Sequence, residues 1–152
     1  MTKIMFVCLG NICRSPMAEF LMRDYVEKLG RSAEFQIASA ATSTWEIGNG
    51  VHRGTKEILL AQGIDPSGKR AVRLTKQDCR TYDYIIGMEM MNVKDILRIA
   101  DNADAHKVCR LLDFTDAPKD IDDPWYTGDF ETTFREVSEG VRALLAHMDA
   151  QN

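Results

Sequence analysis

Residues 7–16 read VCLGNICRSP, and this stretch decides the fold. It leaves an apolar run over Lys3–Cys8, passes through Gly10 and Asn11, and enters a helix near Pro16. An unbroken apolar run is typical of a parallel strand that is buried on both faces. Gly10 and Asn11 tolerate the positive φ that a loop needs to turn its N–H groups inward. The stretch therefore predicts a strand, an anion-binding loop and a helix in succession.

The rest of the chain continues this alternation of strands and helices. Ser15 can serve as the N-cap of the first helix, and Pro16 fits its first position. Further strands are expected over Glu34–Ser39, Tyr82–Met88 and His106–Leu112. The remaining helices are expected over His52–Gln62, from a capping box at Thr75–Asp78, around Val93–Ala100 and over Phe130–Met148.

Long loops are expected over Ala40–Val51 and Asp113–Gly128. The alternation predicts the α/β class, with a small, doubly wound, parallel four-stranded sheet flanked by helices and a phosphate loop after the first strand. Ligands of such sheets bind at the carboxyl ends of the strands, which is where Cys8 falls.

Composition limits the classes of function. The chain has 152 residues, which suits a single domain over residues 1–152. A net charge of −4 argues against nucleic acid as a partner, and no apolar run approaches the ~18 residues of a membrane span. Four scattered cysteines do not resemble a disulfide framework, and no signal peptide is recognisable. We therefore expect a cytoplasmic protein, with secretion lacking a signal peptide left open.

Cys8 and Arg14 carry the predicted chemistry. A thiolate is a strong nucleophile, and N–H groups at a helix N-terminus, together with a guanidinium, favour the thiolate over the thiol. Arg14 can hold two phosphate oxygens in a bidentate fork. The structural alternative is a buried Cys8 and a surface Arg14. The predicted phosphate-binding loop comprises Leu9, Gly10, Asn11, Ile12, Cys13 and Ser15, in which Ser15 donates to the thiolate or caps the helix.

The segment VCLGNICRSPMAE at residues 7–19 resembles the signature of the low-molecular-weight protein tyrosine phosphatases, and the likeness extends over nearly the whole chain. The resemblance implies that Cys8 attacks phosphorus and forms a phosphocysteine that water hydrolyses, with no metal or other cofactor. Asp123, which precedes a proline, would be the general acid and later the base. Taken alone, an Asp-Pro pair is more typical of a plain turn.

The resemblance also implies a substrate cleft. Trp45, Trp125 and Tyr126 would form aromatic walls around a phosphotyrosine protein or a small aryl phosphate. Phosphate and vanadate would inhibit, and a monomer or weak dimer is expected. Cys13 would form a reversible disulfide with Cys8. Ser39 matches a polar network behind the loop that some members support with a His near Lys69, which this chain lacks.

Other readings of the sequence stay open. An arsenate reductase of the same fold needs two further, closely spaced cysteines, but Cys79 and Cys109 lie far apart. A phosphoarginine phosphatase of this fold carries Thr where this chain has Ile12. A phosphocysteine carrier domain, or an inactive phosphotyrosine-binding module, would not need Asp123. The charges of Lys69 and its neighbours are expected on a solvated face.

Overall fold

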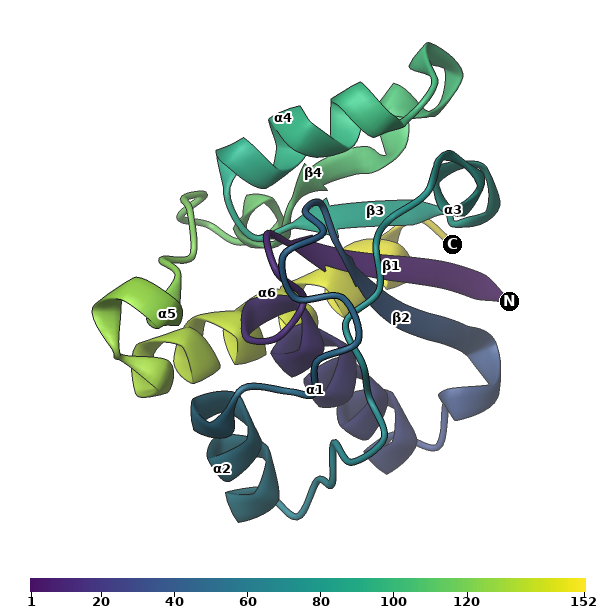
Figure 1. The fold of residues 1–152 in the computed structure, drawn as a ribbon. Coiled ribbons are helices and arrows are strands. Elements are labelled where there is room, and N and C mark those ends of the chain that lie inside the picture. The colour runs from purple at the N-terminus through teal and green to yellow at the C-terminus, as the bar shows by residue number, and fades with distance from the viewer.

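Strand β1 (Thr2–Cys8) lies inside a four-stranded sheet in the computed structural model, which describes residues 1–152 (Figure 1). The strand order is β2-β1-β3-β4 and every pair is parallel, with β2 at Phe35–Ala41, β3 at Tyr84–Gly87 and β4 at Val108–Arg110. The predicted α/β fold is confirmed. The crossover order brings the carboxyl end of β1 between those of β2 and β3, where the loop after Cys8 begins.

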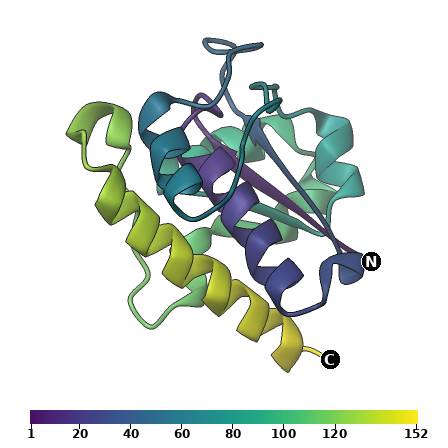
Figure 2. The ribbon, with the colours of Figure 1, turned by 90° about the horizontal axis from the view of Figure 1, so that it is seen from below.

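Alternate residues of β1 serve two hydrophobic cores. Ile4 and Phe6 pack in the larger core with residues of α1 (Arg14–Lys28) and α6 (Phe130–Ala150). Met5 and Val7 pack on the other face, against residues of α3 (Lys76–Thr81) and α4 (Met90–Ile99). Figure 2 shows α1 and α6 side by side on one face of the sheet. Because both faces of β1 are buried, its sequence is apolar without alternation.

Helix α2 (Arg53–Ala61) and the short helix α5 (Pro124–Thr127) complete the helical elements, together with 3-10 turns at Ser32–Glu34, Asn102–Lys107 and Leu111–Phe114. The capping box at Thr75–Asp78 is present at α3. Asn11 has the positive φ that its residue type favours, at 59°. None of the helices combines the length and apolar character that crossing a bilayer requires.

Three local predictions were wrong. The first helix, for which Pro16 fits the first position, begins two residues earlier, at Arg14 after Cys13, and the Ser15 hydroxyl bonds within the loop instead of capping it. The strand expected over His106–Leu112 is only Val108–Arg110, since β4 is an edge strand that pairs with β3 over three residues. The loop expected over Asp113–Gly128 contains helix α5, whose N-cap is Asp123.

Candidate active site

The loop after β1 is shaped by Asn11. Its side-chain amide donates to Ser15 Oγ at 2.7 Å and to Ser39 Oγ at 2.9 Å, and its carbonyl oxygen accepts from the N–H of Val72 at 3.2 Å. All polar atoms of this buried side chain are therefore used. These contacts hold the left-handed backbone of Asn11 in place, because each one requires the side chain to lie beneath the loop rather than in solvent.

The Cys8 sulfur lies at the centre of this loop. The N–H of Asn11 donates to Sγ at 3.3 Å, and Ser15 Oγ lies 3.0 Å from the same sulfur. Because Ser15 already accepts from Asn11, its own proton is free to point at Cys8. The N–H groups of Gly10, Ile12 and Cys13 find no acceptor in the protein. Such a set of free donors around a sulfur is suited to binding an anion.

Arg14 is buried in the first turn of α1 and its guanidinium is fixed from three sides. Nη1 donates to Glu89 Oε2 at 3.0 Å and to the carbonyl oxygen of Ile121 at 2.8 Å, while Nη2 donates to Asp123 Oδ2 at 3.3 Å. Burial lowers the pKa of Arg14, but Cys8, Asp123 and Glu89 outweigh it, so that the pKa lies above its ordinary value. The buried Nε has no partner, which leaves a charged donor for a bound anion.

Asp123 is brought to the loop by helix α5. Its Oδ1 accepts from the N–H of Trp125 at 3.1 Å, as an N-cap does, while its Oδ2 accepts from Nη2 of Arg14. The side chain is 17% exposed, whereas Asp122 beside it lies on the surface. One carboxylate therefore has a fixed position at the edge of the loop and the neighbouring one does not.

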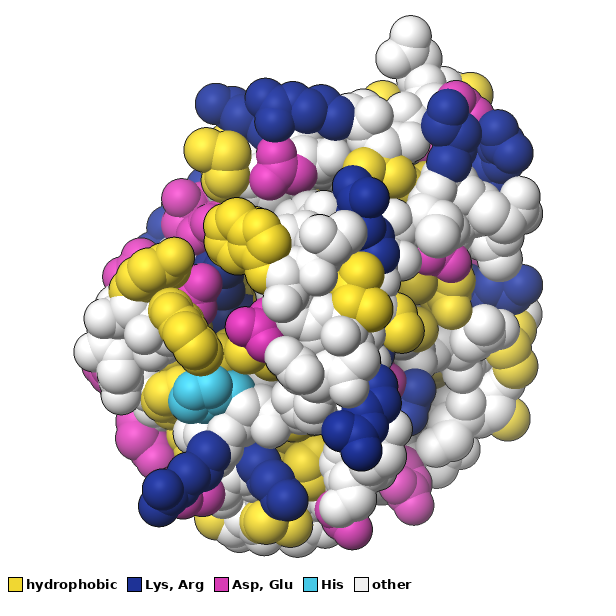
Figure 3. All heavy atoms as spheres, in the orientation of Figure 1, with side chains coloured by type: hydrophobic (Ala, Val, Ile, Leu, Met, Phe, Trp, Pro, Cys, Tyr) yellow, Lys and Arg dark blue, Asp and Glu magenta, His cyan; other side chains and the backbone are white.

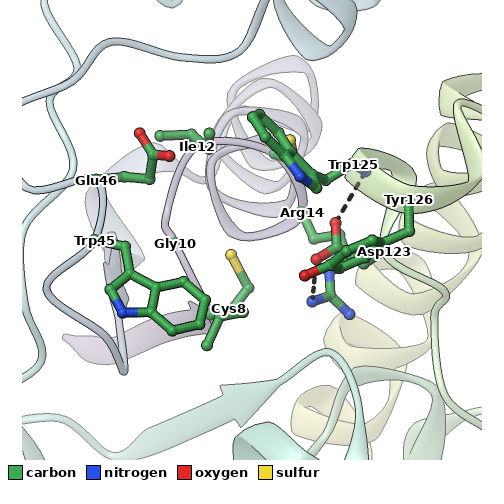
Figure 4. A pocket seen from close by; sticks show the side chains of 11 residues that line it. Cys8, Gly10, Ile12, Arg14, Trp45, Glu46, Asp123, Trp125 and Tyr126 are labelled. Atoms are coloured by element: carbon green, nitrogen blue, oxygen red, sulfur yellow. Dashed lines mark hydrogen bonds and ion pairs between the residues drawn. The ribbon is translucent and has the colours of Figure 1, made fainter.

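A cavity of about 150 Å³ opens above Cys8, lined by the phosphate loop, Arg14, Glu46, Asp123 and three aromatic side chains. Trp45 lies on one side of Cys8, and Trp125 and Tyr126 lie on the other (Figure 4). All three are more than half exposed, which is unusual for large aromatic residues. Hydrophobic side chains gather on this part of the surface, over α5 (Figure 3). A flat, apolar group attached to an anion fits this shape.

The other three cysteines are poor nucleophiles. Burial raises the pKa of Cys13, with Cys8 and Asp123 adding to the effect. Burial also raises the pKa of Cys79 to about 11 and that of Cys109 to about 12. Near neutral pH these three side chains remain thiols, which makes them poor targets for a thiolate-directed reagent.

Of the twelve site residues predicted from sequence, ten line the cavity, and the other two, Asn11 and Ser15, lie directly beneath it. The sequence interpretation missed Glu89, which binds Arg14, and Glu46, which reaches the rim of the cavity. No sequence motif singles out either one. The structure has no cluster of three or more His, Cys, Asp or Glu side chains that could hold a metal ion.

One expectation about the surroundings was wrong. Lys69 was expected on a solvated face, but its ammonium is packed behind the phosphate loop, where it donates to the carbonyl oxygen of Ser39 at 2.9 Å. His52, which has no partner near it in sequence, stacks on Phe130 and meets the edge of Trp125. Both contacts join segments that are far apart in the chain.

Comparison with known proteins agrees with this geometry. Residues 3–152 match the family model described as low molecular weight phosphotyrosine protein phosphatase. The chain is 39% identical to the low molecular weight protein-tyrosine-phosphatase YfkJ of Bacillus subtilis, over 99% of this chain and 98% of that protein. It is 38% identical to the human low molecular weight phosphotyrosine protein phosphatase, over 93% of this chain and 92% of that protein.

Solved structures show the same similarity. The crystal structure of YfkJ superposes with a TM-score of 0.96 and covers 100% of this chain and 97% of that one. SP-PTP, a low molecular weight protein tyrosine phosphatase from Streptococcus pyogenes, is 42% identical, with a TM-score of 0.86 over 97% of this chain and 93% of that one. The protein is a hydrolase that belongs to the low molecular weight phosphotyrosine protein phosphatase family.

Proposed function

We propose that the protein hydrolyses phosphotyrosine monoesters in two steps through a phosphocysteine. The observation that supports this proposal is that Cys8, Arg14 and Asp123 all line one cavity, and that Nε of Arg14 has no partner in the protein. In the first step the Cys8 thiolate attacks phosphorus and the bond from phosphorus to the phenolic oxygen breaks. Arg14 and the loop N–H groups bind the three equatorial oxygens, whose charge grows in the transition state.

Asp123 moves the protons in both steps. As the acid it donates its proton to the departing phenolate, so that tyrosine leaves as a neutral phenol. In the second step the Asp123 carboxylate takes a proton from water while the oxygen attacks phosphorus. The bond from sulfur to phosphorus breaks, which regenerates the thiolate and releases inorganic phosphate. No metal takes part in this scheme, so EDTA should leave the rate unchanged.

The substrate class follows from the cavity walls. Trp45, Trp125 and Tyr126 offer apolar faces to a phenyl ring, and Ile12 adds an apolar side chain where a guanidinium would need a polar one. We therefore favour phosphotyrosine proteins and small aryl phosphates over phosphoarginine. Phosphate and vanadate should compete with substrate for the loop. The protein is expected to act as a monomer or weak dimer in the cytoplasm.

The test is hydrolysis of an aryl phosphate and of a phosphotyrosine peptide. Cys8→Ser should abolish turnover while the near-ultraviolet circular dichroism is kept. Rapid quenching of wild-type protein with labelled substrate should trap one phosphoryl group on Cys8. Cys109→Ser, which changes a cysteine outside the cavity, is the matched control and should retain activity. Turnover by Cys8→Ser at a rate near that of wild type would contradict the mechanism.

A further inference from the structure

A buried ammonium group lies behind the phosphate loop. The Lys69 side chain is only 13% exposed, and its Nζ lies 2.9 Å from the carbonyl oxygen of Ser39 and 3.7 Å from Glu19 Oε1. The Glu19 side chain is 4% exposed. Removing two charges from water is costly unless each has a partner, so this pair needs a reason beyond solubility.

Glu19 faces cations on two sides. Its Oε2 lies 2.6 Å from Arg23 Nη2, on the half-exposed side of α1, and its Oε1 faces Lys69. The same Oε1 accepts the hydroxyl proton of Ser39 at 2.5 Å. Arg23 therefore faces the Glu19 carboxylate from the surface, while Lys69 faces it from within. Without Lys69, the net charge of the groups behind the loop would be more negative by one elementary charge.

A directed chain of hydrogen bonds runs from Glu19 to the nucleophile. Ser39 gives its only hydroxyl proton to Glu19, and its oxygen accepts from the Asn11 amide at 2.9 Å. The second N–H of that amide goes to Ser15 Oγ, which lies 3.0 Å from Cys8 Sγ. Because the Glu19 oxygen accepts the only proton of Ser39, the Asn11 amide donates to both serines, and the last donor of the chain, the Ser15 hydroxyl, points at the sulfur.

The charges at the two ends of this chain interact. Cys8 is faced by Arg14, Asp123 and Cys13 at the cavity, and Lys69 by Glu19 and Arg23 behind it. Burial lowers the pKa of Lys69, and Glu19 and Cys8 oppose that shift. Since this attraction is mutual, the Lys69 charge lies where it attracts a negative charge placed at Cys8.

We propose that Lys69 is a positioning residue for the phosphatase reaction, which neutralises Glu19 so that the Ser39–Asn11–Ser15 chain can hold Cys8 as a thiolate. This inference rests on the proposed role of Cys8 as the nucleophile.

The test is the pH dependence of inactivation by iodoacetate, which reports the thiolate of Cys8. Lys69→Met should raise the pH of half-maximal inactivation rate by about one unit, equal to a roughly tenfold loss of thiolate at low pH. Lys69→Arg, which keeps the charge, should stay near wild type. The double variant Lys69→Met/Glu19→Gln should return toward wild type, because both charges are then gone. Lys56→Met is the control, since this exposed lysine lines the groove next to Lys69.

Glu19→Gln alone provides an independent measurement. The Gln carbonyl oxygen can still accept the Ser39 proton, so the hydrogen-bond chain is kept while the Lys69 charge loses its counter-charge. The pH of half-maximal inactivation should therefore fall below that of wild type. If Lys69→Met does not fold, this single variant decides, and an unchanged or raised value overturns the inference. If Lys69→Met folds and keeps the wild-type profile, the inference is also overturned.

The wild-type profile separates this inference from the proposed function. An ordinary alkaline thiol at Cys8 in wild type would overturn both. A wild-type thiolate near neutral pH that Lys69→Met leaves unchanged would overturn only the role of Lys69.

Discussion

Arg14 shows how much of the site depends on one side chain. It is among the largest fully buried side chains of the protein, and its guanidinium reaches a carboxylate, a backbone carbonyl oxygen and the Asp123 carboxylate at once. Its planar fork allows these contacts while Nε stays free, which a lysine ammonium cannot reproduce. Arg14 thus holds Asp123 in place, so that the proposed acid and the proposed phosphate ligand are positioned together.

Asp123→Asn should lower kcat for phenyl phosphate by about 10²- to 10⁴-fold, because the phenolate then leaves without a proton. For an aryl phosphate whose phenol is strongly acidic, the loss should be much smaller, since that leaving group needs no proton. The measurement is kcat across a series of aryl phosphates of graded phenol acidity. Asp122→Asn is the matched control, and a larger loss in that variant would show that the acid is misassigned.

At the level of the secondary-structure elements, His52 connects helix α2 to the phosphate loop and to the aromatic wall. His52 is the N-cap of α2, where its Nδ1 accepts from the N–H of Gly54 at 3.0 Å, and its backbone N–H donates to the Ile12 carbonyl oxygen at 2.8 Å. Its ring centroid lies 5.1 Å from that of Phe130 and 5.5 Å from that of Trp125. One residue thereby links the start of α2, the phosphate loop and the aromatic wall on α5.

His52→Asn should separate these roles, since Asn is a good N-cap but has no ring to stack. We expect the stability to be close to wild type and KM for aryl phosphates to rise by about 2- to 10-fold, from the lost aromatic contact with Trp125. Steady-state kinetics and Trp fluorescence measure the effect, with the exposed His106→Asn as control. An unchanged KM would mean that the ring does not position the wall.

Gly140 sets the distance between α6 and the 3-10 turn at Leu111–Phe114. A Cβ at this position would lie 2.5 Å from Leu111 Cγ, in a fully buried side chain. Gly140→Ala should therefore lower the free energy of unfolding by about 1–3 kcal/mol, although Ala is normally the better helix former. Denaturant unfolding tests this, with the exposed Glu139→Ala as control. A stabilised Gly140→Ala would show that the helix can shift without cost.

At the scale of the whole molecule, the end of the chain is joined to its first half. Helix α6 packs along α1. Arg31, which follows the end of α1, donates to both carboxylate oxygens of Asp149 near the end of α6 and to both carboxylate oxygens of Glu34. Hydrogen bonds from Arg31 lower the pKa of Glu34 and of Asp149 below their ordinary values. This contact holds together three segments that lie far from the active site.

Removal of Arg31 should have a pH-dependent effect. A lowered carboxylate pKa gives stability that is fully present above the ordinary values of 4.5 for Glu34 and 3.8 for Asp149, and that is lost as pH falls through the lowered values. Arg31→Ala should lower Tm by about 1–3 °C at pH 7 and by nothing at pH 2. Arg98→Ala, whose pair with Asp95 lies within α4, is the control. A pH-independent loss would exclude this linkage.

The chain sequence by itself determined the first third of the fold and most of the cavity. The capping box at Thr75–Asp78 depends on contacts between near neighbours, while the apolar run of β1 and the residue type of Asn11 indicate burial and a positive φ directly, so all three can be recognised from sequence. Cys8 and Arg14 are brought together by the same short loop. Asp123 and the aromatic residues were assigned through resemblance to a family, because local pattern alone favours a plain turn.

Only the tertiary structure decided the partners of the buried charges. Arg14 pairs with Glu89, which lies 75 positions away in sequence, and Lys69 pairs with Glu19, which lies 50 positions away. No local signal in the sequence predicts these pairings. The sequence left two uses open for the Ser15 hydroxyl, capping the helix or donating to Cys8, and the folded structure places it on the Cys8 sulfur. Local hydrogen bonding is encoded along the chain, whereas the pairing of buried charges is set by which strands and helices become neighbours.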